Sequence, residues 1–185
     1  MASHLLHENI CNSIYNLKKT GYEIYVDTAC GQSHPVLSTT KQNLPFFFDG
    51  AHSNATEITN VDLIITKDDK IVLICEIEES AHKPIHIYGK FFSLLSSQYG
   101  KVIINKTAKK LDFSDKIIFL QVVSEENLPQ GSSKPKQWEN IEKSIQSMIS
   151  SHFPKFKYYL LHGRINDFSL RSRNHGELIY IMNQL

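Results

Sequence analysis

The sequence predicts an α/β fold with a mixed central β-sheet flanked by helices, and three observations lead to it. The expected elements follow one another in the order α-β-β-β-α-β-β-α-β, which favours helices packed on both faces of one sheet. Residues 116–123 are almost wholly apolar, as in a strand at the centre of a sheet. The 185 residues, 41% hydrophobic and 21% charged, fit one compact domain spanning residues 1–185.

Periodicity predicts the first elements. Apolar residues recur at helical spacing at Leu6, Ile10, Ile14 and Leu17. This spacing indicates a helix with Ser3 as its N-cap and Gly21 as its stop signal. A strand is expected over residues 22–26. Residues 27–60 are rich in Gly, Pro, Ser, Thr and Asn, and they predict mostly loop with at most a short strand.

Two strong strand patterns, residues 61–65 and 71–78, flank a hairpin turn over residues 67–70. A helix is expected over residues 83–97, with Pro84 in its first turn. The remaining elements are strands over residues 101–105 and 116–123, a long helix capped by Ser133, a strand over 156–161, and a short helix or strand over 177–182.

Acids in buried-looking strands are the most informative feature of the sequence. Alternation places Glu76 and Glu78 on one face of their strand. A hairpin loop with an odd number of residues would set Asp62 opposite Glu76, where cross-strand Cβ atoms are about 4.5–5.5 Å apart. An even loop would put them on opposite faces unless a β-bulge restored the register.

Three carboxylates at this spacing favour a hard divalent cation, because like charges so close repel one another unless they are neutralised. Magnesium typically takes one or two carboxylates together with water and phosphate oxygens. A single such acid would be better explained as a solvated strand end. The three together predict a Mg²⁺ site.

The segment Asn60-Val61-Asp62, the hairpin and Glu76-Ile77-Glu78 resemble the PD-(D/E)XK nuclease superfamily, in the variant whose final lysine is replaced by glutamate. The resemblance implies a restriction-endonuclease-like αβββαβ core, with Asp62 and Glu76 as metal ligands. It also implies that Glu78 takes the lysine position and places or deprotonates the attacking water. Valine precedes Asp62 where proline is usual, and no lysine follows Glu76 at the second position.

The chain is also similar to the small cleavage subunit of heterodimeric type IIS restriction endonucleases. That resemblance implies a larger subunit that recognises the double-stranded DNA and cuts its other strand. The charge balance agrees with such a division of labour. With 20 basic and 19 acidic residues, the chain lacks the surplus of Lys and Arg that supplies most non-specific affinity for nucleic acid.

Several basic residues are candidates for phosphate contacts. Lys83, His86 and Lys90 lie on one stripe of the helix that follows the glutamates, although a solvated face would explain them equally well. Lys83 or Lys90 is positioned to supply the positive charge that the motif lacks. All three arginines, Arg164, Arg171 and Arg173, fall within ten residues and suit bidentate phosphate or partner contacts, with a charged surface loop as the alternative.

Glu8 lies on the first helix, where the resemblance implies an extra acid that contacts metal through water, and an ordinary surface acid is the simpler interpretation. The pairs His4/His7 and His82/His86 have helical spacing, but without a cysteine pair or an HExxH motif they predict no zinc site. The phosphate-loop, GxGxxG and GxSxG motifs are absent, so no nucleotide cofactor is expected.

Cysteine usage and hydropathy suggest a compartment. Cys11, Cys30 and Cys75 are odd in number and far apart, which favours reduced thiols, a core position for Cys75 and a cytoplasmic protein. No apolar run approaches the roughly 20 residues that span a bilayer, so no membrane association is expected. The N-terminal residues are mixed and polar, unlike a secretory signal.

Together these patterns predict a Mg²⁺-dependent endonuclease subunit that hydrolyses one strand of duplex DNA and relies on a larger partner. Two alternatives stay open: a non-catalytic binding module on the same scaffold, and a self-sufficient homodimeric nuclease. Within the nuclease hypothesis, Glu78→Ala should be severe for cleavage. Glu79→Ala should matter less, because alternation points Glu79 to the other face of the strand.

Overall fold

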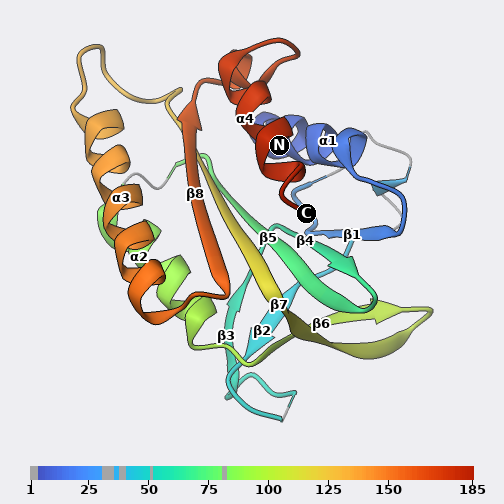
Figure 1. Ribbon diagram of the computed structural model, residues 1–185. Helices are drawn as coiled ribbons and strands as arrows, with labels where there is room; N and C mark the ends of the chain where they lie inside the picture. The colour runs from blue at the N-terminus through green and yellow to red at the C-terminus, as the bar shows by residue number, and fades with distance from the viewer. Residues whose placement is uncertain (1–3, 31–35, 38–40, 51, 81–82) are drawn as a thin grey trace.

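The computed structural model describes residues 4–30, 36–37, 41–50, 52–80 and 83–185 (Figure 1). The strands are β1 (Tyr22–Val26), β2 (Pro45–Phe47), β3 (Glu57–Asn60), β4 (Leu63–Lys67), β5 (Lys70–Glu78), β6 (Tyr99–Ile104), β7 (Thr107–Ser124) and β8 (Phe156–Gly163). The helices are α1 (Leu5–Leu17), α2 (Pro84–Leu95), α3 (Lys134–His152) and α4 (Arg173–Met182), and a 3-10 helix, η2, spans Ile165–Phe168.

The strands form one mixed sheet with the order β1-β4-β5-β7-β6-β2-β3, and β8 pairs with β7 outside this path. The pairs β5–β7 and β7–β8 are parallel, whereas the other pairs are antiparallel. Helices α2 and α3 lie on one side of the sheet, and α1 and α4 on the other (Figure 1). The predicted mixed α/β architecture is therefore confirmed.

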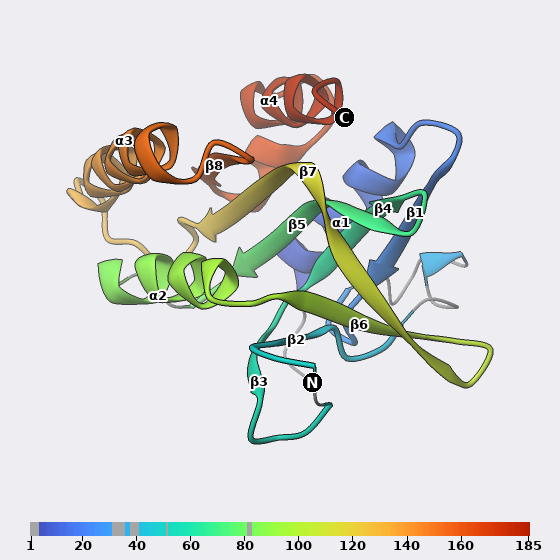
Figure 2. The ribbon, with the colours of Figure 1, turned by 60° about the horizontal axis from the view of Figure 1, so that its bottom comes forward.

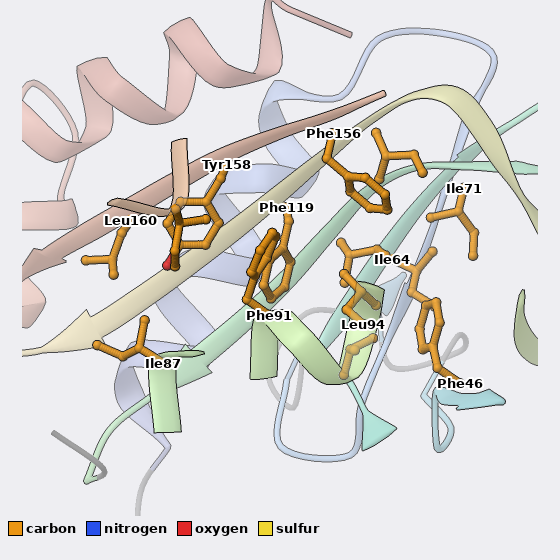
Figure 3. Packing of buried hydrophobic residues seen from close by; sticks show 14 of the residues in the cluster. Phe46, Ile64, Ile71, Ile87, Phe91, Leu94, Phe119, Phe156, Tyr158 and Leu160 are labelled. Carbon is orange, nitrogen blue, oxygen red and sulfur yellow. The ribbon is translucent and has the colours of Figure 1, made fainter. Parts of the chain in front are cut away.

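Each face of the sheet carries its own apolar core. On one face, α2 and α3 pack against the sheet through residues such as Phe91, which stacks on Phe119 and meets Tyr158 edge-on (Figure 3). On the other face, α1 and α4 cover the opposite side chains of β4, β5 and β7. Burial of each such side chain contributes about 1.5–3 kcal/mol, so the two cores fix the sheet between its helices.

Three strands end together at one edge of the sheet. Glu78 at the end of β5 pairs with Val123 of β7, and Ser124 pairs with Gly163 at the end of β8. These are parallel strands, so their carboxyl ends share this edge, here called the carboxyl edge. The β6–β7 hairpin projects away from it (Figure 2). Ligand sites of open α/β sheets lie outside the carboxyl ends of strands, so this edge is where a site is expected.

The hairpin between β4 and β5 has an even loop, and a bulge corrects its register. The loop consists of Asp68 and Asp69, both with positive φ, as in a two-residue type I′ turn. Farther along, the ladder shifts by one residue at Val72, which pairs with no residue of β4. Beyond this bulge the register pairs Leu63 with Cys75, the residues next to Asp62 and Glu76. The molecule thus combines an even loop with the β-bulge that such a loop requires.

Other elements differ from the sequence-based expectations. Helix α1 begins one residue after His4, its N-cap, and Ser3 lies outside the described residues. Residues 27–60 contain two strands, β2 and β3. β7 starts at Thr107 instead of residue 116, and residues 177–182 belong to the helix α4. Ser133 is the N-cap of α3, but its side chain makes no capping bond, and the Ser132 hydroxyl accepts the Lys134 N–H instead (3.2 Å).

None of the helices in the described part of the chain combines the length and the apolar character that a membrane-spanning segment needs. The three cysteines are free and buried, and Cys75 belongs to the core beneath α1, as predicted.

Candidate metal centre

Three predicted acids meet at the carboxyl edge. Glu76 and Glu78 are near and at the end of β5, and Asp62 lies in a bend immediately before β4, because the strand predicted over residues 61–65 begins at Leu63. The last residue pair of the β4–β5 ladder is Leu63 with Cys75, and beyond it the Asp62 N–H donates to the Cys75 carbonyl (3.2 Å), which brings Asp62 beside the strand that carries Glu76. Because β4 and β5 are buried between the two cores, these acids lie at the ends of the strands, where the chain leaves the cores.

Asp62 is held by the backbone of β5 and faces helix α1. Its Oδ2 accepts the Ile77 N–H at 2.6 Å, so the side chain continues the ladder where the backbone of β4 has turned away. Its Oδ1 lies 3.6 Å from His7 Nε2. One carboxylate thus contacts both the strand that carries Glu76 and the helix on the far face.

Glu76 is buried against a lysine of α2. Its side chain is 3% exposed, and both of its carboxylate oxygens lie 3.2 Å from Lys90 Nζ. Burial, and then the charge of Asp62, raise the pKa of Glu76 well above its usual value, while Lys90 opposes this shift. The charged form of Glu76 would be stabilised by any further cation that came close to it.

Glu78 shares the same electrostatic environment. Burial and the charge of Asp62 raise the pKa of Glu78, and the positive charges of Lys90, His86 and His7 oppose the rise. The charge of Asp62 acts on the pKa of both glutamates, so the three carboxylates share one electrostatic environment, although among the described residues they do not form a group whose ligand atoms all lie within 4.8 Å of one another. The donor set consists of hard oxygens, which suits Mg²⁺ or Mn²⁺ better than softer metals.

The other predicted residues are distributed unevenly around this centre. Lys90 contacts Glu76, and the exposed His86 is near enough to act on the pKa of Glu78. Lys83 is the exposed N-cap of α2, and in the described residues no ion pair joins it to the acids. Glu8 is partly buried on α1, but His7 is the residue of that helix that faces Asp62. His82 lies outside the described residues.

The arginines are not gathered against the acids. Arg164 follows the last residue of β8 at the carboxyl edge, whereas Arg171 and Arg173 flank the start of α4. All three lie at the surface, and within the described ranges none makes an ion pair.

Sequence reasoning missed the N-terminus of α1. Glu79 Oε1 accepts the N–H groups of Leu6 (2.9 Å) and His7 (3.3 Å), so Glu79 caps the helix from the end of β5. The Nδ1 atoms of His4 and His7 lie near the same carboxylate. The His4/His7 spacing was visible in the sequence, but only the topology that sets α1 beside the end of β5 supplies the third residue.

Gln121 is a further buried polar residue beside the acids. It pairs in register with Glu76 across the parallel β5–β7 ladder and is fully buried. The Tyr158 hydroxyl donates to its Oε1 (2.6 Å), but within the described residues nothing accepts from its Nε2. Buried amide groups rarely lack a hydrogen-bond partner, so this NH₂ group is able to donate to a further group beside Glu76.

Comparisons of the chain with protein-family models, with curated proteins and with solved structures give no match. The function is therefore argued from the geometry of the site.

Proposed function

We propose that the chain is a Mg²⁺-dependent endonuclease subunit that hydrolyses one strand of duplex DNA. The observation that carries the proposal is the contact of Asp62 with β5 between the two glutamates, where its Oδ2 accepts the Ile77 N–H at 2.6 Å and its charge raises the pKa of both Glu76 and Glu78. Mutually repelling carboxylates persist in a fold where they serve a cation, and oxygen donors are the ligands that Mg²⁺ prefers.

The topology supports a restriction-endonuclease-like core. With β2, β3 and β6 treated as additions, the remaining elements run α1, β1, β4, β5, α2, β7, which is the order αβββαβ. In the sheet, β1, β4 and β5 are successive antiparallel neighbours, and β7 joins β5 in parallel. The acids sit on the hairpin of this core.

Each residue has a distinct role in the proposed reaction. Asp62 and Glu76 would hold the ion, which when bound would lower the pKa of a water and stabilise charge on the phosphodiester. Glu78, with its raised pKa, accepts the proton of the attacking water. Lys90 Nζ, which already contacts Glu76, supplies the positive charge that the sequence motif lacks. His86 and Arg164 are placed to contact the DNA backbone from α2 and from the end of β8.

A cleavage and binding experiment tests the proposal. Supercoiled plasmid is incubated with Mg²⁺ and the chain, with and without a larger DNA-recognising subunit, and Mn²⁺ binding is followed by electron paramagnetic resonance. Asp62→Asn and Glu76→Gln should abolish cleavage and weaken Mn²⁺ binding. Glu139→Gln, at an exposed acid of α3, is the matched control. Wild-type-like cleavage by Asp62→Asn, or Mg²⁺-displaceable Mn²⁺ binding that survives Glu76→Gln, would refute the assignment.

The ion pair between Glu76 and Lys90 also supports a second candidate, a binding module without catalysis. In that function Glu76 already has its cationic partner, and the acids meet a basic protein surface. The Mn²⁺ titration separates the two functions, because the module has no use for a Glu76-dependent ion. A self-sufficient homodimeric nuclease would cut plasmid without any added subunit.

A further inference from the structure

A second group of metal-ligating side chains lies at the N-terminus of α1, beside Asp62. It consists of His4, His7 and Glu79, whose ligand atoms all lie within 4.8 Å of one another. We propose that these three residues bind a divalent transition metal of the zinc class, at a site separate from the carboxylates that would hold Mg²⁺.

The distances suit direct coordination. His7 Nδ1 lies 3.1 Å from Glu79 Oε1, and His4 Nδ1 lies 3.5 Å from Glu79 Oε2. Tetrahedral zinc with bonds of about 2.0–2.1 Å separates its ligand atoms by roughly 3.3 Å. These two separations lie on either side of that value, and the ligand atoms of His4 and His7 lie within 4.8 Å of one another, so side-chain rotation can close the set around an ion.

The state of His7 points independently to a ligand. The residue is 7% exposed, and its Nδ1 atom is buried. Although Nδ1 is close to Glu79, the pair lacks hydrogen-bond geometry, and the described residues offer this nitrogen no other partner. The other ring nitrogen, Nε2, faces Asp62 Oδ1 at 3.6 Å. Metal-binding histidines usually direct their second nitrogen at a carboxylate in this way.

The donor set selects the class of metal. Two imidazole nitrogens and one carboxylate suit Zn²⁺ and its neighbours, whereas Mg²⁺ prefers oxygen ligands throughout. Three protein ligands leave one position for water. Access from solvent exists, since His4 is exposed and a cavity of about 180 Å³ is lined by Glu79, Leu5 and Leu6.

Such an ion would join the start of α1 to the end of β5. Glu79 already makes this connection by capping the helix through Oε1, and the ion would add both histidines to it. It would also fix the ring of His7 against Asp62. This site does not rest on the proposed nuclease function, because its three ligands differ from the carboxylates assigned to Mg²⁺, although His7 Nε2 faces Asp62.

The test is metal binding by the full chain. Zn²⁺ is titrated calorimetrically, and Co²⁺ is titrated by its visible absorption. The wild-type chain should bind one equivalent, and His4→Ala should weaken binding at least tenfold. His4 is a suitable site, because its side chain makes no capping bond and its loss spares the helix. His152→Ala, at an exposed histidine on α3, is the matched control and should bind like the wild type.

Two further measurements keep the result decisive. Glu79→Gln retains an oxygen that can cap α1 but loses the anionic ligand, so it should keep the fold and lose the metal. Glu76→Gln should leave Zn²⁺ binding unchanged even where cleavage is lost, which separates a failure of this proposal from a failure of the nuclease proposal. Unchanged affinity in His4→Ala, or a thiolate-to-cobalt charge-transfer band that places the ion at the cysteines, would overturn the inference.

Discussion

Glu76 is a buried acid whose ion-pair partner, Lys90, is 34% exposed. The carboxylate depends on that amine, because burial and Asp62 both disfavour its charge. Burying a charge is tolerated when the pairing is good, and losing one partner leaves the other uncompensated. The stability of the candidate site is therefore sensitive to pH.

Lys90→Met should destabilise the protein by about 1–3 kcal/mol at neutral pH, less than for a fully buried pair because Lys90 is partly solvated. Without Lys90, the pKa of Glu76 in the folded state rises further above its unfolded value. Protonation of Glu76 then stabilises the folded protein, and this stabilisation is lost as the pH rises through the folded-state pKa. Urea unfolding at pH 5 and pH 8 should show a larger deficit at pH 8, and equal deficits would contradict this account.

Glu79 has a structural role whichever function is correct. Since its carboxylate accepts two N–H groups of the first turn of α1, Glu79→Ala should cost about 0.5–2 kcal/mol, the range for lost helix caps. Thermal or urea unfolding measures the loss, and Glu57→Ala on the exposed strand β3 is the control. A Glu79→Ala chain as stable as the control variant would show that the cap is unimportant.

At the residue scale, the sequence predicted that Asp62 and the two glutamates lie at the ends of neighbouring strands, but not which residues contact them. The alternation in residues 71–78 correctly placed Glu76 and Glu78 on one face, and Glu79 lies toward α1 on the other. His7 escaped prediction because its role depends on a helix docking 55 residues away from Asp62 in sequence. Local spacing carries no information about such a contact.

Among the elements, the β4–β5 and β6–β7 hairpins of the sheet share one strained feature. The turns Asp68–Asp69 and Asn105–Lys106 have positive φ at both central residues, and neither contains glycine. Left-handed backbone costs about 1–2 kcal/mol per residue for ordinary side chains. Asn-Gly is the preferred pair for such a type I′ turn.

Lys106→Gly should therefore stabilise the protein, by up to about 1 kcal/mol, because it creates an Asn-Gly turn and relieves one left-handed residue. Equilibrium unfolding in urea measures the change. Lys109→Gly, three residues farther into β7, is the control and should destabilise, since glycine weakens a strand interior. A Lys106→Gly chain less stable than the wild type would mean that this turn is not strained.

Regular elements were predictable where one periodicity dominated a segment, as in α1, α2, α3 and β5. The sequence allowed a short strand in residues 27–60, where the structure has both β2 and β3, because this stretch carries turn-forming residues in bulk and the pairing of β2 with β6 is a long-range contact. The sequence predicted a bulge only for the case of an even loop. Whether a bulge forms at Val72 depends on how both faces of the strand pack, and the hairpin sequence alone does not show this.

Across the whole molecule, charge is spread so that neither sign dominates, with a net charge of +1. The carboxyl edge is acidic at its centre, and the arginines lie on the segment from the end of β8 to the start of α4. Phosphate contacts set the affinity of a protein for DNA and its dependence on salt.

A chain with Arg164→Gln, Arg171→Gln and Arg173→Gln should bind duplex DNA more weakly whatever the base sequence of that DNA. The slope of log affinity against log salt should fall by roughly one for each phosphate that the variant no longer neutralises. Fluorescence anisotropy at several salt concentrations measures both effects. The control replaces Lys134, Lys136 and Lys143 of α3 by glutamine, and equal slopes in the two variants would exclude the arginines from the DNA surface.

Asp62 is anchored twice, by the amide of Ile77 on the sheet and by His7 on the first helix. Replacing His7 by alanine would remove one of these two restraints while Leu6 and the apolar layer beneath the helix stay in place. A His7→Ala chain is thus expected to stay folded and yet position Asp62 poorly. A protein that bound the first turn of this helix and moved His7 would therefore change the position of Asp62 without contacting the carboxylates.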